Sequence, residues 1–193
     1  MWTGKSGEMP RLLKRVMAFI DGNYLRKDVE KLFGDVDIHY SKLLLTVVIR
    51  GLHPFYRGTL VRTYYYDAIP NPAETIAFQK QMEYFRTIGK YDGFEVREGR
   101  AIKKGSKGLS QKGVDTLITM DMLSKAYEDQ YDAAVLLSGD NDFLDLVYEL
   151  KDRGKVIIGA FFEHSVSEPL KNSFDRKIVL EKASMEQLII PKK

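Results

Sequence analysis

Two kinds of hydrophobic pattern alternate along the chain. Short, fully apolar or β-branched runs are typical of strands in a parallel sheet that is buried on both faces. Longer stretches, with apolar residues three or four positions apart, are typical of helices that bury one face. We predict strands at residues 16–20, 59–66, 94–98, 133–137, 156–162 and 177–180, and helices within residues 22–33, 42–50, 73–88, 113–127, 142–152 and 167–172.

Two segments fit this alternation less simply. Residues 42–50 follow Ser41, which suits a helix N-cap, but their run of leucine, valine and isoleucine is also compatible with a strand. Residues 97–112 are rich in glycine, lysine and arginine. We predict that most of this second segment is a loop.

The alternation of strands and helices predicts an α/β fold with a mainly parallel central sheet. A chain of 193 residues can bury one good-sized core, so we expect one domain. We place it at residues 14–183. Residues 1–13 are then a flexible lead-in, and residues 184–193 are a C-terminal tail.

Composition narrows the classes of function. The chain has no cysteine, which excludes disulfides, thiolate nucleophiles and cysteine-ligated metal sites. The absence of cysteine fits a reducing compartment, so we expect a cytoplasmic protein. No apolar run has the length of a membrane span, so we expect no membrane partner. The net charge of +3 and the pI of about 8.9 are compatible with an anionic partner.

Aspartates follow two of the predicted central strands. Asp21 comes directly after the strand at 16–20, and Asp140 and Asp142 come after the strand at 133–137. Asp115 begins a predicted helix. In an open parallel sheet, ligands bind beyond the carboxyl ends of the strands, where the strand order reverses. If the two strands are neighbours, these aspartates converge on one crevice.

Converging carboxylates repel one another unless a cation compensates. Oxygen ligands with no histidine or cysteine nearby select Mg²⁺ or Mn²⁺ rather than zinc. Such ions activate water and stabilise the leaving oxygen of a phosphodiester. Helix capping is an alternative explanation for Asp115 and for Asp142, since an aspartate at the start of a helix is often its N-cap.

Three short motifs occur in a defined order: residues 19–25 (FIDGNYL), 112–115 (KGVD) and 138–143 (SGDNDF). In order and spacing they resemble the motifs of the NYN domain family, which includes LabA-like proteins and belongs to the PIN-like nucleases. The resemblance covers roughly residues 16–162. It implies a Rossmann-like three-layer sandwich, a Mg²⁺ or Mn²⁺ site, and a metal-dependent ribonuclease that acts on RNA, which we expect to be single-stranded.

The resemblance also implies roles for individual residues. By position, the catalytic and metal-binding carboxylates are Asp21, Asp115, Asp140 and Asp142. Asn23 would orient the site or touch the substrate phosphate. Ser138 could bind phosphate, or it could make a turn hydrogen bond.

Other polar and aromatic features admit two interpretations each. The basic segment could bind RNA phosphates through Arg100, Lys103, Lys104 and Lys107, or it could be a solvated surface loop. Tyrosines 64–66 could stack on bases, although core packing on a strand is the interpretation we favour. The three histidines are scattered, and we assign them no role. The oligomeric state stays open, a homo-oligomer included.

Other functions compete with the ribonuclease. A phosphatase or phosphotransferase with Asp21 as nucleophile would need a second acid two residues later, where this chain has Asn23. A catalytically inactive PIN-like module that binds RNA or protein is an alternative, although four unpaired aspartates are costly when nothing binds them. A dinucleotide-binding oxidoreductase lacks its Gly-x-Gly-x-x-Gly motif after the first strand.

Overall fold

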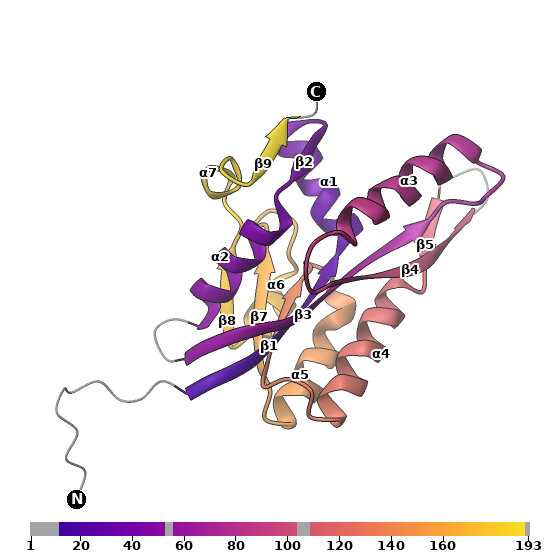
Figure 1. Ribbon diagram of the computed structural model, residues 1–193. Coiled ribbons are helices and arrows are strands. Elements are labelled where there is room, and N and C mark those ends of the chain that lie inside the picture. The colour runs from indigo at the N-terminus through magenta and orange to yellow at the C-terminus, as the bar shows by residue number, and fades with distance from the viewer. Residues whose placement is uncertain (1–11, 53–55, 104–108, 192–193) are drawn as a thin grey trace, which may run out of the picture.

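A seven-stranded sheet runs through the middle of the molecule (Figure 1). The computed structural model describes residues 12–52, 56–103 and 109–191. The strand order is β5-β4-β3-β1-β6-β7-β8, and every neighbouring pair is parallel except β4 and β5. The strands are β1 (Leu12–Asp21), β3 (Tyr56–Ile69), β4 (Phe94–Lys103), β5 (Leu109–Lys112), β6 (Ala133–Leu137), β7 (Val156–Phe161) and β8 (Arg176–Val179).

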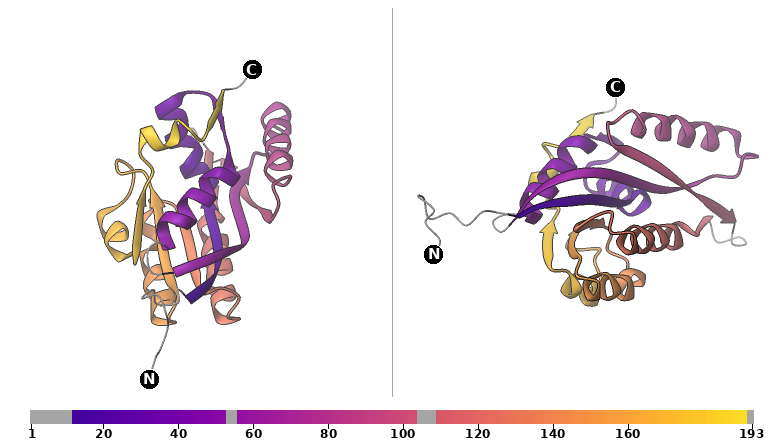
Figure 2. Two further views of the ribbon diagram at one scale, coloured as in Figure 1. Left: turned by 60° about the vertical axis from the view of Figure 1, so that its left-hand side comes forward. Right: turned by 60° about the horizontal axis from the view of Figure 1, so that its bottom comes forward.

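Helices cover both faces of this sheet. One face carries α1 (Gly22–Phe33), α2 (Tyr40–Leu52) and α3 (Thr75–Ile88). The opposite face carries α4 (Val114–Tyr127), α5 (Leu144–Asp152) and α6 (Glu168–Ser173). In Figure 2 the purple and magenta helices lie on one side of the strands, and the salmon and orange helices lie on the other. The predicted α/β sandwich with a mainly parallel sheet is confirmed.

The central strand shows why the core has two halves. Side chains alternate between the faces of a strand. Val16, Ala18 and Ile20 of β1 therefore pack with α1, α2 and α3, whereas Met17 and Phe19 pack with α4 and α5. All five are at most 5% exposed. Because both faces of β1 are buried, this strand holds the residue at its carboxyl end, Asp21, in a fixed place.

Several local predictions are confirmed and others are corrected. Residues 42–50 are helical, as part of α2, but Ser41 lies inside the first turn because the helix begins at Tyr40. Tyrosines 64–66 are buried in the core, at most 6% exposed, as the packing interpretation expected.

The basic segment is not mostly a loop, and that prediction was wrong for its described part. β4 continues to Lys103 and pairs antiparallel with β5, with Arg100 opposite Lys112. Pairing gives backbone partners to an edge of the sheet that would otherwise be open. Residues 104–108 lie outside the described residues.

A second, two-stranded sheet joins distant parts of the chain. β2 (Val36–Ile38) pairs antiparallel with β9 (Ile189–Pro191), and a short helix, α7 (Lys182–Met185), precedes β9. The segment we assigned to a C-terminal tail contributes Met185 and Leu188 to the core beside α1 and α2. Across the described residues, no helix is both long and apolar enough to span a bilayer.

Candidate active site

The strand order reverses between β1 and β6. From β1 the chain builds β3 and β4 on one side, then returns to place β6, β7 and β8 on the other. β1 and β6 are parallel neighbours, with Ile20 opposite Leu137. Their carboxyl ends therefore lie side by side at the point where parallel α/β sheets bind ligands.

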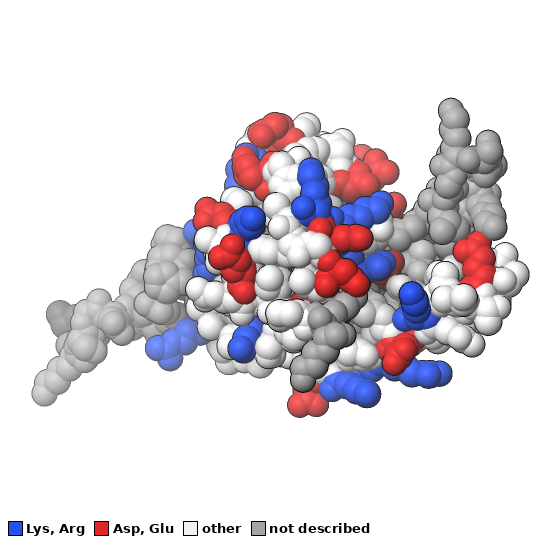
Figure 3. Space-filling model, turned by 90° about the horizontal axis from the view of Figure 1, so that it is seen from above, with Lys and Arg blue, Asp and Glu red and all other residues white. Residues whose placement is uncertain are grey.

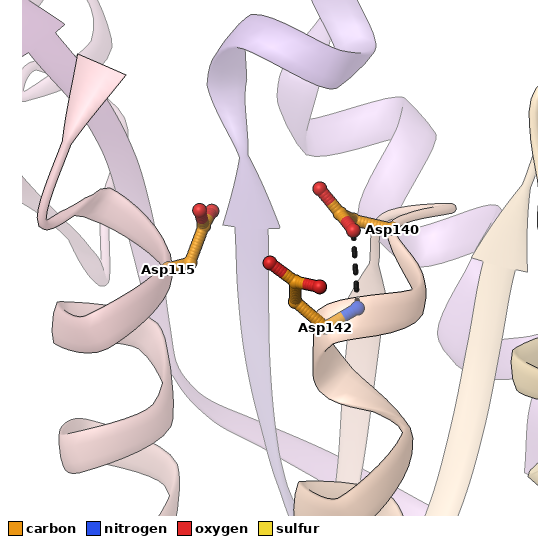
Figure 4. Close-up of side chains that lie close together, drawn as sticks. All are labelled: Asp115, Asp140 and Asp142. Carbon is orange, nitrogen blue, oxygen red and sulfur yellow. Dashed lines mark hydrogen bonds between the residues drawn. The ribbon is translucent and has the colours of Figure 1, made fainter. Parts of the chain in front are cut away.

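Three aspartates meet at this point. Asp115 comes from the first turn of α4, Asp140 follows β6, and Asp142 lies in the 3-10 turn η2 (Asn141–Phe143). One carboxylate oxygen from each lies within 4.8 Å of the others. Figure 4 shows the side chain of Asp115 facing those of Asp140 and Asp142. We call these three residues the aspartate cluster.

Backbone hydrogen bonds position two members of the cluster. The Asp142 N–H donates to Asp140 Oδ1 at 3.0 Å, so Asp140 caps η2. The Asp140 N–H in turn donates to Ser138 Oγ at 3.3 Å. Asp140 thus sets the conformation of the turn that presents Asp142.

Asp115 does not cap its helix, so the capping explanation fails for it. The N-cap of α4 is Gly113, whose φ of 90° lies in the left-handed region, and no side chain caps this end. Asp115 sits one residue inside α4, where a negative charge interacts favourably with the helix dipole. Its carboxylate therefore makes no capping hydrogen bond, and it faces Asp140 and Asp142.

Asp21 lies beneath the cluster rather than in it. Its side chain is buried, with 7% of the residue exposed. Asp21 Oδ1 accepts the Tyr24 N–H at 3.0 Å and so caps α1, and Oδ2 accepts the Ser138 hydroxyl at 3.3 Å. Burial raises the pKa of Asp21 to about 6, against the lowering effect of the Tyr24 N–H, and repulsion from Asp115 and Asp67 adds to the rise.

Within the cluster, the carboxylates repel one another, and this repulsion affects the pKa of Asp115. Partial burial raises the pKa of Asp115 above its ordinary value, and the neighbouring carboxylates of Asp140 and Asp142 raise it further. No lysine or arginine whose side chain is described forms an ion pair with any of the three. The described part of the protein thus supplies no cation that balances this charge.

The cluster fits a hard divalent cation. All its donor atoms are carboxylate oxygens, the ligands that Mg²⁺ and Mn²⁺ prefer. Two oxygens on opposite sides of one ion, each about 2.1 Å from it, lie about 4.2 Å apart. The separation of up to 4.8 Å is only slightly wider. The three carboxylates are therefore close enough together to ligate one ion.

The predicted substrate-binding residues fall into different settings. Asn23 lies in the first turn of α1 and is partly exposed. Ser138 is fully buried, and its hydroxyl is already engaged with Asp21 and with the Asp140 N–H, so in this structure it holds the site together and does not face a substrate. Arg100 and Lys103 belong to β4, whereas Lys104 and Lys107 lie outside the described residues.

The charge of the surrounding surface is mixed. Figure 3 views the molecule from the end at which the parallel strands finish, and described basic and acidic side chains are interspersed there. A pocket of about 630 Å³ between α1, β2 and α3 is lined by none of the four predicted aspartates. The aspartate cluster is exposed to solvent and is distinct from that pocket.

Sequence reasoning missed a group of residues beside the site. His164 Nε2 lies 2.8 Å from Asp28 Oδ1, and Ser165 Oγ lies 2.6 Å from Asp28 Oδ2. Ser165 Oγ is also 2.9 Å from the Tyr24 hydroxyl. Asp28 and His164 are 136 positions apart, and no local pattern relates them. Only Tyr24, which lies inside the first motif, carried any signal.

Comparisons with known proteins agree with this architecture. A family model described as the NYN domain matches residues 15–181. The chain is similar to a crystal structure of a protein of unknown function from Vibrio parahaemolyticus, with a TM-score of 0.64 and 18% identity, over 95% of this chain and 99% of that one. That likeness bears on the fold alone. No curated protein matches the chain significantly.

Proposed function

This chain belongs to the NYN domain family, and from that premise we propose that it is a metal-dependent ribonuclease that hydrolyses RNA at the aspartate cluster. One observation carries the proposal: oxygens of Asp115, Asp140 and Asp142 lie within 4.8 Å of one another at the carboxyl end of the sheet. Three carboxylates so close together are costly without a cation.

Asp115, Asp140 and Asp142 would hold the ion, which we propose to be Mg²⁺ or Mn²⁺. When bound, such an ion supplies the positive charge that activates water and stabilises the leaving oxygen of a phosphodiester. Asp140 has a second role, because its other contact, to the Asp142 N–H, keeps η2 in shape.

Asp21 would act from below the cluster. Its two oxygens are held by the Tyr24 N–H and the Ser138 hydroxyl, so its charge stays directed at the site. It adds a fourth negative charge to the field that attracts the cation. Since its pKa is raised to about 6, this charge is present at neutral pH and diminishes in mild acid.

RNA would reach the ion from solvent, because the cluster is exposed. We propose that Asn23 contacts a phosphate beside the ion. Arg100, Lys103, Lys104 and Lys107 would add affinity for the RNA backbone, which is mainly electrostatic and independent of sequence. The position of β5 supports a role of this segment in RNA binding. β5 ends at Lys112, and two residues later α4 begins, the helix that carries Asp115.

The test is cleavage of a labelled single-stranded RNA by the purified protein. We expect cleavage with Mn²⁺ or Mg²⁺, none with EDTA, and none by Asp140→Asn, which keeps an oxygen that can cap η2. The Asp140→Asn protein, purified in the same way as the wild type, also serves as the control for a contaminating nuclease. Cleavage that survives both EDTA and Asp140→Asn would refute the proposal.

A further inference from the structure

Tyr24 connects the two halves of the site. Its backbone N–H donates to Asp21 Oδ1 at 3.0 Å, at the end of β1. Its side chain crosses to the end of β7, where the Phe162 N–H donates to the Tyr24 hydroxyl oxygen at 3.0 Å and Ser165 Oγ lies 2.9 Å away. One residue thus touches the strand that carries Asp21 and the loop that follows β7.

The protons in this network can be assigned by counting donors. Ser165 Oγ has a single proton and lies closer to Asp28 Oδ2, at 2.6 Å, than to the Tyr24 hydroxyl. Its one proton goes to Asp28 Oδ2, so at the longer contact the Tyr24 hydroxyl donates to Ser165 Oγ. Burial raises the pKa of Tyr24 to about 12, so its hydroxyl keeps that proton at neutral pH.

The far end of the network is anchored in the core. Asp28 is 7% exposed, and its second oxygen lies 2.8 Å from His164 Nε2. A buried carboxylate with two side-chain partners holds them in place, since breaking either contact leaves it unsatisfied. Ser165 and His164 are therefore fixed against α1.

Tyr24 and Ser165 also pack closely against Gly139, the residue before Asp140. A Cβ added to Gly139 would lie 2.3 Å from the Ser165 carbonyl oxygen and 2.8 Å from Tyr24 Cε2, both too close for any side chain. The Ser167 N–H also donates to the Gly139 carbonyl oxygen at 3.0 Å. Gly139 is thus held between the Tyr24 ring and the loop after β7, one residue before Asp140.

We propose that Tyr24 is a positioning residue for the aspartate cluster: it fixes the β6–η2 turn, and with it Asp140 and Asp142, relative to Asp21 on β1. The proposal rests on the metal site of the proposed function. Removing the Tyr24 hydroxyl would free the loop after β7 and loosen the backbone at Gly139. The carboxylates would then spend less time in the arrangement that holds one ion.

The experiment compares Tyr24→Phe with Tyr127→Phe. Both remove one hydroxyl and keep the ring, but the Tyr127 hydroxyl donates to Glu149 at an exposed contact at the other end of α4. Mn²⁺ affinity is measured by titration of the folded, metal-free proteins, and thermal unfolding is followed in parallel. We expect Tyr24→Phe to bind Mn²⁺ about 10- to 100-fold more weakly, as is usual when a residue that orients metal ligands is lost. Tyr127→Phe should bind like the wild type.

A merely structural role would give a different pattern. In that case Tyr24→Phe would unfold at a lower temperature yet bind Mn²⁺ with wild-type affinity while folded, and this result would overturn the proposal. Ser165→Ala removes the partner of the Tyr24 hydroxyl and should weaken Mn²⁺ binding in the same direction. It provides the same test should Tyr24→Phe fail to fold.

Failure of the ribonuclease proposal is distinguishable from failure of this one. A wild-type protein that binds Mn²⁺ without cleaving RNA would refute the ribonuclease, and the titration of Tyr24→Phe would still decide the role of Tyr24. A wild-type protein that binds no Mn²⁺ would refute both. Where cleavage is measurable, Tyr24→Phe should need more Mn²⁺ for half-maximal rate, while its KM for RNA at saturating Mn²⁺ stays unchanged.

Discussion

Aspartates lie at both ends of the central sheet, but their neighbours differ: at the amino end they are basic side chains, and at the carboxyl end they are other carboxylates. At the amino end, Arg15 lies 2.8 Å from Asp132 and 3.1 Å from Asp129, and Lys155 lies 2.5 Å from Asp129. The Arg15 guanidinium lowers the pKa of Asp132 to about 2. At the carboxyl end, the carboxylates of the aspartate cluster face one another, and the pKa of Asp115 is raised.

The difference distinguishes charges that stabilise the folded protein from charges that a bound cation would have to balance. Opposite charges at the amino end tie β1 to the turn before β6, which stabilises the protein without any partner. Like charges at the carboxyl end oppose folding until a cation binds. A site that costs stability in the free protein is a common sign of function.

The largest expected effect is on activity, from Asp115→Asn. Loss of one of three metal ligands should lower RNA cleavage by on the order of 10³-fold, because the ion's share of transition-state stabilisation is several kcal/mol. The metal-free variant should unfold at the same temperature as the wild type or a higher one, since a repulsive charge is gone. Initial rates with Mn²⁺ and thermal unfolding in EDTA measure the two quantities. A variant that loses both activity and metal-free stability would contradict the distinction between the two ends.

A smaller effect is expected on the pH dependence of stability. The pKa of Asp21 is about 6 in the folded protein against an ordinary 3.8, so the folded state binds this proton more tightly. The resulting stabilisation is complete below pH 4 and is lost as the pH rises to 6, by at most about 3 kcal/mol. The contribution of Asp132 depends on pH in the opposite direction. Its lowered pKa stabilises the folded protein above pH 4, and this stabilisation is lost as the pH falls toward 2.

Urea unfolding in EDTA between pH 4 and 7 measures this dependence. Asp21→Asn keeps an oxygen for the Tyr24 N–H and should flatten the fall in unfolding free energy between pH 4 and 6. An unchanged profile would mean that the burial of Asp21 does not govern stability in this range.

The smallest effect is expected at the amino end, from Asp132→Asn. The Asp132 side chain is 27% exposed, so its charge is partly screened. Loss of its ion pair with Arg15 should lower the free energy of unfolding at pH 7 by about 1 kcal/mol. RNA cleavage and Mn²⁺ affinity should stay at wild-type values. A marked loss of metal binding would show that the two ends of the sheet are coupled.

Much of the site could be predicted because its parts are local. Asp21, Asp140 and Asp142 were placed at strand ends by the apolar runs that precede them, whereas Asp115 depended on the resemblance of its motif to the family. Capping was harder to assign: it was considered for Asp115 and Asp142, whereas the structure gives it to Asp21 and Asp140. An N-cap depends on where a helix begins to within one residue, which hydrophobic periodicity does not resolve.

By itself, the sequence determined the alternation of strands and helices, the α/β class and the positions of the strand-end aspartates, because these depend on residues a few positions apart. The tertiary structure decided which carboxylates meet, how β4 pairs with β5, and that Asp28 contacts His164 and Ser165. The strands of the β4–β5 pair are close in the chain, but the segment between them gave no strand pattern. The other contacts join segments distant in the chain, so they exist only once the strand order has brought β1, β6 and β7 together.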